Sequence, residues 1–355
     1  MSTDPTNPTV QAARSSAAPF AKALAATFAR YREPSWSRSL WQLGNSAALF
    51  GATWVAMYLL LDVSYWLTLA LTVPAAFFLM RLFIIQHDCG HGSFFRKQKL
   101  ADWVGRVIGV LTLTPYTYWR KTHAVHHANS GNLEHRGFGD INTLTVAEYL
   151  QLSWWGRLKY RVYRNPFVLF IIGAAIHFVV RHRLPFIVPR TWKRERQSIL
   201  LTNVGIAALI VAAGTTLGWR EFLMVQLPIT LLACSLGVWL FYVQHQFEHT
   251  YWEHDPAWSY DTAALEGSSY LALPRVLQWA TGNIGLHHIH HLNARIPNYR
   301  LPQVLRDHPE LTRVSRITLW ESIRCMRLAL WDEAQRRLVS FRSARARLRS
   351  ERARP

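Results

Sequence analysis

The stretch Gly285-Leu286-His287-His288-Ile289-His290-His291-Leu292-Asn293 places four histidines within five residues and holds no acid and no cysteine. Two other segments are also rich in histidine, Ile85-Gln86-His87-Asp88-Cys89-Gly90-His91 and Arg120-Lys121-Thr122-His123-Ala124-Val125-His126-His127. Neutral imidazole binds zinc, copper, iron and nickel. Spacings of three and four residues point two rings from one face of a helix. Together the three segments predict one polyhistidine metal centre, which the rest of the chain assembles.

The composition is that of a membrane protein. Half of the 355 residues are hydrophobic and only 17% are charged, which is unusually apolar for a soluble protein. The apolar residues also fall in blocks of about bilayer length, whereas a soluble core would divide them into shorter amphipathic segments.

The formal net charge is +19. Most basic residues lie outside the apolar blocks, so their expected partners are anionic lipid headgroups, the cytoplasmic side of a membrane or an acidic protein. The sequence shows no basic recognition helix and no aromatic RNA-binding strand, so nucleic acid is not an expected partner. Three scattered cysteines, Cys89, Cys234 and Cys325, do not suit a disulfide framework or a cysteine-rich zinc site and favour a reducing compartment.

Four apolar blocks predict the membrane-spanning helices. Leu40 to Leu61 has no charged residue, and Ser64 to Ile85 is interrupted only by Arg81 near its end. The second pair is Ile199 to Gly218 and Phe222 to Val243. Each pair is joined by a short turn, so we expect two helical hairpins with spans at about 40–61, 64–85, 199–218 and 222–243.

The remaining segments suit the membrane surface. Leu100 to Trp119 carries charges and Asn165 to Val180 is short for a span, so both are expected to be interfacial or re-entrant helices. The loop Arg181 to Arg196 has six basic residues and one acid. The positive-inside bias assigns this loop, both termini and all histidine segments to the cytoplasmic face. The predicted fold is an all-α integral membrane protein with four transmembrane helices in two hairpins, interfacial helices and a cytoplasmic histidine-rich cap.

This fold predicts three regions along the chain. Residues 1–35 are expected to form a disordered or interfacial tail, in which Phe20 to Tyr31 suits the membrane surface. Residues 36–335 form the membrane domain. Residues 336–355 hold eight arginines and one glutamate and are expected to form a solvated or lipid-facing tail.

His245, at the end of the last span, brings the number of candidate metal ligands to nine. They are His87, His91, His123, His126, His127, His245, His287, His290 and His291. Nine imidazoles are too many for one tetrahedral zinc and suit two ions of higher coordination number. Asp88 and Asp140 are expected to orient imidazoles, since ligating histidines usually donate their second N–H to a carboxylate. His249 and His288 are expected to be hydrogen-bonding neighbours or plain surface residues.

With these segments the chain resembles the membrane fatty acid desaturases of the acyl-lipid type, which carry H-x-x-x-H, H-x-x-H-H and H-x-x-H-H boxes. The resemblance runs from about Leu40 to Leu301. It extends to the segments Gly139 to Thr145, Trp239 to His245 and Gly282 to His291, each of which is similar to a family signature.

The resemblance implies a four-span fold with a cytoplasmic cap and a non-haem di-iron centre. It also implies O2-dependent removal of two hydrogens from an acyl chain, which introduces a cis double bond into a membrane lipid. The family's catalytic histidines match His87, His91, His123, His126, His127, His287, His290 and His291, and a further ligand matches His245. Related animal enzymes use an asparagine near that place, where this chain has Phe241, and His249 is a competing candidate for the ninth position.

The chemistry requires an external source of electrons. Breaking an unactivated C–H bond is beyond side-chain acid–base chemistry and needs a metal–oxygen oxidant. The sequence has no recognisable nicotinamide-, flavin- or haem-binding domain. We therefore expect a separate donor, such as a ferredoxin or a cytochrome b5 type with its reductase.

Rival functions remain open at this stage. A hydroxylase, ketolase or alkane oxygenase would use the same centre, and box spacing does not separate these outcomes, although Asn293 to Tyr299 is similar to the acyl desaturases. A metal transporter would place ligands near the bilayer midplane. A haem electron carrier would place paired histidines inside facing spans, whereas these clusters lie at helix ends or in loops.

Overall fold

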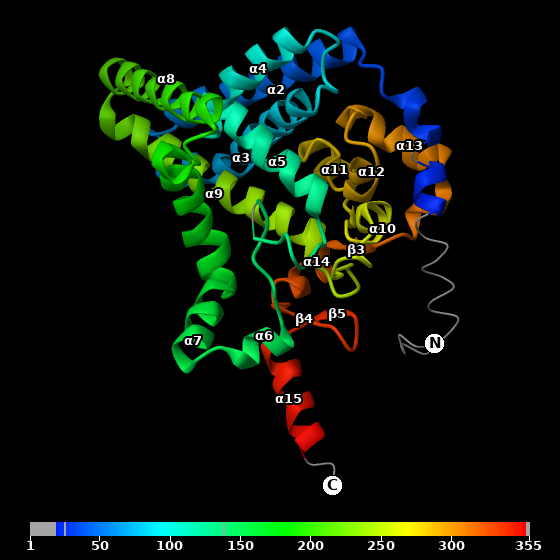
Figure 1. Ribbon diagram of the computed structural model, residues 1–355. Coiled ribbons are helices and arrows are strands. Elements are labelled where there is room, and N and C mark those ends of the chain that lie inside the picture. Colours follow the sequence, from blue (N-terminus) through cyan, green and yellow to red (C-terminus); the bar gives the residue numbers. More distant parts are fainter. Residues whose placement is uncertain (1–18, 25, 138, 353–355) are drawn as a thin grey trace.

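The computed structural model describes residues 19–24, 26–137 and 139–352, and the chain is mostly helical (Figure 1). The long helices are α2 (Trp36–Leu59), α3 (Tyr65–His91), α8 (Lys193–Leu217) and α9 (Trp219–His245). Between the two pairs lie α4 (Gln98–Leu111), α5 (Tyr116–Asn129), α6 (Val146–Gln151), α7 (Trp154–Tyr163) and the π-helical segments η2 (Val168–Gly173) and η3 (Ile176–Val180). After α9 come α10 (Tyr260–Glu266), α11 (Arg275–Ala280), α12 (His287–Leu292), α13 (Leu301–Asp307), α14 (Leu319–Cys325) and α15 (Phe341–Arg352). The 3-10 turns are η1 (Phe28–Tyr31), η4 (Arg181–Arg183), η5 (Pro185–Ile187), η6 (Asn298–Arg300) and η7 (Pro309–Thr312).

Among the described residues, three helices, α3, α8 and α9, are long and apolar enough to cross a membrane. They cover the second, third and fourth predicted spans. The first predicted span coincides with α2, which has 24 residues but is not among the helices that meet this requirement. A further segment, α7 followed by residues 168–183, is long and apolar enough to cross a membrane only if its two parts form one span bent by 68°. This segment includes residues 165–180, which were predicted to be interfacial or re-entrant.

Helix α3 is the centre of the packing and contacts α2, α4, α5 and α9. Its side chain Ile85 is fully buried in a core shared with Met57 of α2, Tyr116 of α5 and Ile229 of α9. The helix ends at Gly92, whose φ of 68° is the left-handed conformation that commonly terminates a helix. The last two turns of α3 therefore hold their side chains inside the molecule, where α5 and α9 meet them.

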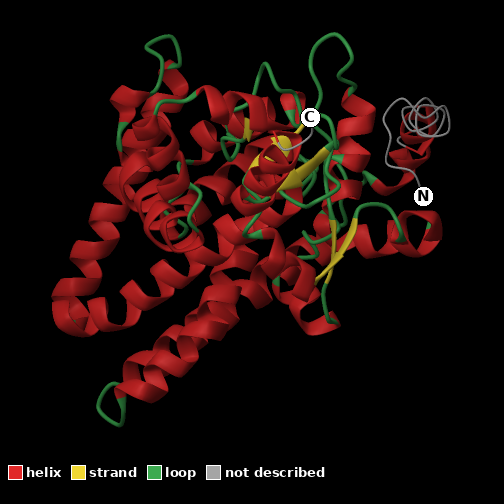
Figure 2. Cartoon of the chain, turned by 90° about the horizontal axis from the view of Figure 1, so that it is seen from below, coloured by secondary structure: helices red, strands yellow, loops and turns green. Residues whose placement is uncertain are grey.

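The described chain is all-helical, as predicted, apart from five short strands (Figure 2). They are β1 (Leu144–Thr145), β2 (Tyr270–Ala272), β3 (Arg316–Thr318), β4 (Leu330–Asp332) and β5 (Arg337–Val339). β1 pairs in parallel with β4, which pairs antiparallel with β5. β2 pairs in parallel with β3. These pairings attach the C-terminal part of the chain to the loops that follow α5 and α10.

The N-terminal segment differs from its prediction. Phe28 and Tyr31 are buried in a core with Leu292 of α12 and Leu301 of α13, and the Tyr31 hydroxyl donates to Asp307 Oδ2 at 2.7 Å. The apolar face of this short amphipathic segment is therefore covered by protein, where the sequence suggested a membrane surface. The part of the predicted tail before residue 19 lies outside the described residues.

The C-terminal segment, predicted to be a solvated or lipid-facing tail, begins inside the body of the protein. The hairpin of β4 and β5 spans the boundary predicted at residue 335, and Leu338 is buried against Trp331 and Trp252. Helix α15, which follows this hairpin, projects from the body of the protein (Figure 1). Residues 353–355 lie outside the described part of the chain.

Candidate metal centre

Helices α3, α5, α9 and α12 bring the nine predicted ligands together. The histidines form two groups, within each of which one ligand atom per residue lies within 4.8 Å of the others. The first group is His87, His91, His123, His127 and His290, and the second is His126, His245, His287 and His291. The segments 120–127 and 285–293 each contribute to both groups. The reason is helix phase, because residues four apart share a face and the residue between them points elsewhere.

The first group joins α3, α5 and α12. His127 Nε2 lies 3.1 Å from His123 Nε2 and 3.2 Å from His290 Nε2. The rings of His87 and His91, one turn apart on α3, have centroids 4.6 Å apart, and His87 lies 4.5 Å from the ring of His290. Imidazoles from three helices therefore converge on one point.

The second group joins α5, α9 and α12. His245 Nε2 lies 3.1 Å from His126 Nε2 and 3.0 Å from His287 Nε2. The two groups touch where His127 stacks on His291, with ring centroids 4.1 Å apart. Two metal sites in this arrangement would be neighbours within one centre.

Hydrogen bonds to Nδ1 orient three of the rings. His87 Nδ1 donates to Asp88 Oδ1 at 3.0 Å, and His126 Nδ1 donates to Asp140. His245 Nδ1 donates to the backbone carbonyl of Gly267 at 3.0 Å. Such acceptors set the tautomer and leave Nε2 free for a metal ion. The predicted roles of Asp88 and Asp140 agree with these contacts.

Asp88 also connects the centre to α2 through residues that sequence reasoning missed. Its Oδ2 accepts hydrogen bonds from the backbone and side-chain nitrogens of Asn298 at 2.7 and 2.8 Å. Asn298 Oδ1 in turn accepts from Gln42 Nε2 at 2.8 Å. The sequence signal for this contact was Gln42, because a side-chain amide inside an apolar helix needs a buried hydrogen-bond partner.

Five histidines carried by α5 and α12 lie in surroundings that favour the neutral imidazole. Burial lowers the pKa of each well below its ordinary value, because it disfavours the charged form, and the neighbouring imidazoles act in the same direction. These residues are His123, His127, His287, His290 and His291. Neutral imidazole is the form that binds a metal ion.

The residues present fit a metal ion in each group. Nε2 of His87, His91 and His291 is buried and has no hydrogen-bond partner in the described part of the chain. Unpaired buried nitrogens are costly unless something else occupies them. A donor set made only of neutral imidazoles suits iron, zinc or copper and does not suit magnesium or calcium.

The two other histidines predicted near the site lie outside both groups. His288 is buried, and its Nε2 faces the carbonyl of Leu311 at 3.2 Å while its ring stacks on Tyr270. Burial lowers the pKa of His288 to about 4. His249 is exposed and lines a surface cleft next to Phe247 and Glu248. The structure therefore gathers His245, and not His249, into the second group.

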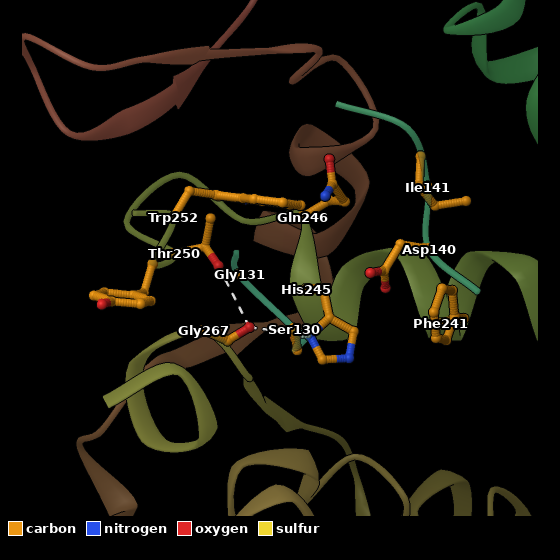
Figure 3. Close-up of a pocket in the computed structure, with 11 residues that line it drawn as sticks. Ser130, Gly131, Asp140, Ile141, Phe241, His245, Gln246, Thr250, Trp252 and Gly267 are labelled. Carbon is orange, nitrogen blue, oxygen red and sulfur yellow. Dashed lines mark hydrogen bonds between the residues drawn. The ribbon is translucent and has the colours of Figure 1, made fainter. Parts of the chain in front are cut away.

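A small pocket borders the second group (Figure 3). Its walls include Ser130, Asp140, Phe241 and His245, and its volume is about 10 Å³. This volume accommodates about one water molecule. An elongated apolar substrate would therefore have to reach the histidines by another route.

Comparison with known proteins gives one consistent result. A family model described as "Fatty acid desaturase" matches residues 64–322. A "Fatty acid desaturase" of Bacillus subtilis is 49% identical over 322 residues, which cover 91% of each chain. An "sn-1 oleoyl-lipid 12-desaturase" of Synechocystis is 26% identical over 280 residues, 77% of this chain and 75% of that protein. An "sn-1 acyl-lipid omega-3 desaturase (ferredoxin)" of Synechocystis is 26% identical over 62% of this chain and 61% of that protein.

Proposed function

The chain belongs to the fatty acid desaturase family, whose members are oxidoreductases, and from this premise we propose that it introduces a cis double bond into an acyl chain of a membrane lipid with O2 as oxidant. The observation that carries the proposal is the pair of buried histidine groups at the ends of apolar helices. The lipid-linked substrate is supported by the names of the Synechocystis relatives, which act on acyl lipids.

The metal ions in this proposal are two non-haem irons. The ligands to the first are His87, His91, His123, His127 and His290, and the ligands to the second are His126, His245, His287 and His291. When bound and reduced, the irons would supply the O2-dependent oxidation that side chains alone cannot perform. The protein's part is to hold nine imidazoles, to fix three of them through Asp88, Asp140 and Gly267, and to keep water away.

The reaction balances with an external donor of two electrons. A methylene pair, O2, two electrons and two protons give a cis double bond and two water molecules. O2 takes up four electrons, of which two come from the acyl chain. The other two come from a separate carrier, and a ferredoxin is supported by the name of one Synechocystis relative.

The topology in this proposal has four spans, α2, α3, α8 and α9, with the histidine groups and both termini on the cytoplasmic side. His91 ends α3 and His245 ends α9, and a shared centre requires both helices to end on the same side. The start of α8 lies on that side too, because Glu195 pairs with Lys121 of α5 at 3.3 Å. Residues 92–192 therefore begin and end on one side, which favours a bent, re-entrant path for residues 154–183 over a single crossing.

The test is to express the full chain in a host that lacks polyunsaturated lipids and to identify new fatty acids by mass spectrometry. We expect a new cis-unsaturated acyl chain that depends on O2. A hydroxylated product would instead support the rival oxygenase reaction. A strong Soret band in the purified protein would support a haem carrier and contradict the di-iron proposal.

A further inference from the structure

Three of the helices that carry the histidines have an aromatic residue four positions before a histidine. Phe83 precedes His87 on α3, Trp119 precedes His123 on α5, and Phe241 precedes His245 on α9. Residues four apart lie on one face of a helix. We call Phe83, Trp119 and Phe241 the aromatic set.

One member of the aromatic set, Trp119, covers the first histidine group, and a second, Phe83, packs against it. Trp119 stacks on His123 with ring centroids 4.5 Å apart and planes 19° apart, and it lies 5.6 Å from the ring of His87. Phe83 meets Trp119 edge-on at 5.5 Å. Trp119 comes this close to α3 because residue 90 is glycine, where an added Cβ would lie 2.9 Å from Trp119 Cζ3.

The third member covers the second group. The ring of Phe241 lies 5.1 Å from that of His126 and 5.6 Å from that of His245. The aromatic set therefore contacts both places where a metal ion would be held.

Each member of the aromatic set is partly exposed. From Arg81 to Cys89 every residue is buried except Phe83, and from Leu240 to Phe247 every residue is buried except Phe241. Trp119 is half-buried as well. In each of these two stretches, the one residue left accessible thus lies one helical turn before a histidine of the two groups.

All three aromatic residues lie on the side of the histidines that faces the apolar interior. Phe83 and Phe241 precede the histidine ends of α3 and α9, so they lie toward the middle of these helices. On α5, the backbone N–H of Thr117 donates to Ser198 Oγ at 3.1 Å, and Lys121 pairs with Glu195 at 3.3 Å. Ser198 lies further from the start of α8 than Glu195 does. The beginning of α5, which contains Trp119, is therefore nearer to the middle of α8 than the end of α5, which carries the histidines.

We propose that the aromatic set binds the acyl chain beside the metal centre and determines which carbon pair is oxidised. This inference rests on the proposed function. A methylene chain has no polar group for hydrogen bonding, so its position can be fixed only by the shape of the apolar surface that it touches. Rigid rings that contact both histidine groups from the apolar side provide such a surface, and they determine how far the chain slides past the metals.

The experiment replaces members of the aromatic set by leucine and locates the double bond in the products by mass spectrometry. One methylene in an apolar pocket changes discrimination by roughly 10- to 200-fold. We therefore expect Phe83→Leu and Phe241→Leu to raise the share of products with a displaced double bond by about tenfold, with metal content unchanged. Phe78→Leu is the matched control, because Phe78 lies on the same helix as Phe83 but packs against Trp279.

A second measurement does not depend on turnover. A phospholipid with a diazirine in its acyl chain is photolysed with metal-free protein, and the labelled peptides are identified. We expect label on the peptides that contain Phe83, Trp119 and Phe241, and less label when unlabelled phospholipid is in excess. Label only on other peptides, or an unchanged double-bond position in active Phe83→Leu and Phe241→Leu, would overturn the inference. A parent protein that makes no unsaturated product would refute the proposed function instead, while the labelling result would still report on the aromatic set.

Discussion

Asp88 holds His87 through one carboxylate oxygen, at 3.0 Å from the imidazole Nδ1, and holds Asn298 through the other. The residue thereby fastens the first histidine group to the segment that follows α12. Loss of a hydrogen-bond acceptor behind a ligating histidine typically weakens metal binding by about 10- to 100-fold. We expect Asp88→Asn to have an effect of this size, because the amide cannot both accept from His87 and keep both contacts with Asn298.

The measurement is competition for iron between purified protein and a chelator. Asp62→Asn, in the turn after α2, is the control and should retain iron like the parent protein. Equal iron retention by Asp88→Asn and the parent would contradict the assignment of His87 as a ligand.

Replacement of any one of the nine grouped histidines by alanine should abolish desaturation and leave the protein in the membrane. The reason is that insertion depends on the apolar helices and their internal hydrogen bonds, not on the metal ions. Membrane fractionation and lipid analysis measure the two effects separately. His249→Ala is the matched control, because His249 is exposed and outside both groups. Full turnover by any two of the nine variants would mean that the ligand set is wrong.

Stability should depend on pH through His254. Its Nε2 lies 2.9 Å from Glu333 Oε1 and its Nδ1 contacts Glu134, and these hydrogen bonds raise the pKa of His254 above its ordinary value of 6.5. A group whose pKa is raised by folding contributes its full stabilisation at pH values below its unfolded-state pKa. This stabilisation is lost as the pH rises through its folded-state pKa. The contribution is small, since the side chain is half exposed.

The check is the melting temperature in detergent from about pH 6 to about pH 9, a range that brackets histidine titration. The parent should lose more stability than His254→Gln as pH rises. The nearby contact between His135 and Asp255 is present in both proteins, so the difference between the two curves isolates His254. Parallel curves would mean that His254 does not couple to folding.

Local spacing predicted which histidines gather in the two groups, but it did not predict the contacts that hold them. The spacing of His123, His126 and His127 follows from helix periodicity, and so does their division between two groups once α5 is known to be a helix. The bond between Asp88 and Asn298 joins residues 210 positions apart, and no local pattern contains it. Phe28 and Tyr31 show the same limit, because an amphipathic segment fits a membrane surface or a protein groove equally well from its sequence.

Topology can be tested with accessibility tags. Tags at both termini and in the loop of residues 181–196 should report the same side of the membrane, and probes beside Asp62 and Gly218 should report the other side. If residues 154–183 crossed the membrane once, α3 and α9 would end on opposite sides and His91 and His245 would be separated by the bilayer. A C-terminal tag on the side of Asp62 would therefore contradict the shared metal centre as well as the fold.

The basic loop before and at the start of α8 is suited to an acidic electron donor. Arg190, Lys193 and Arg194 are exposed and Arg196 is half-buried, and none of them forms an ion pair with the described residues. The one acid in this stretch, Glu195, pairs with Lys121 of α5, so the loop is attached to the helix that carries His123, His126 and His127. A donor bound at this loop would lie beside the element that leads to both histidine groups.

We therefore expect salt to slow donor-dependent reduction of the metal centre, because charges separated by more than a Debye length of about 8 to 10 Å are screened near physiological ionic strength. The effect should appear in the donor's apparent affinity and not in the maximal rate. Neutralising Arg190, Lys193, Arg194 and Arg196 together should flatten this salt dependence, whereas removal of residues 342–355 should change it less if α15 contacts only lipid. Stopped-flow reduction by a ferredoxin across a salt series compares the quadruple variant with the parent. Identical salt slopes would mean that the donor binds elsewhere and that the loop serves only to orient the chain in the membrane.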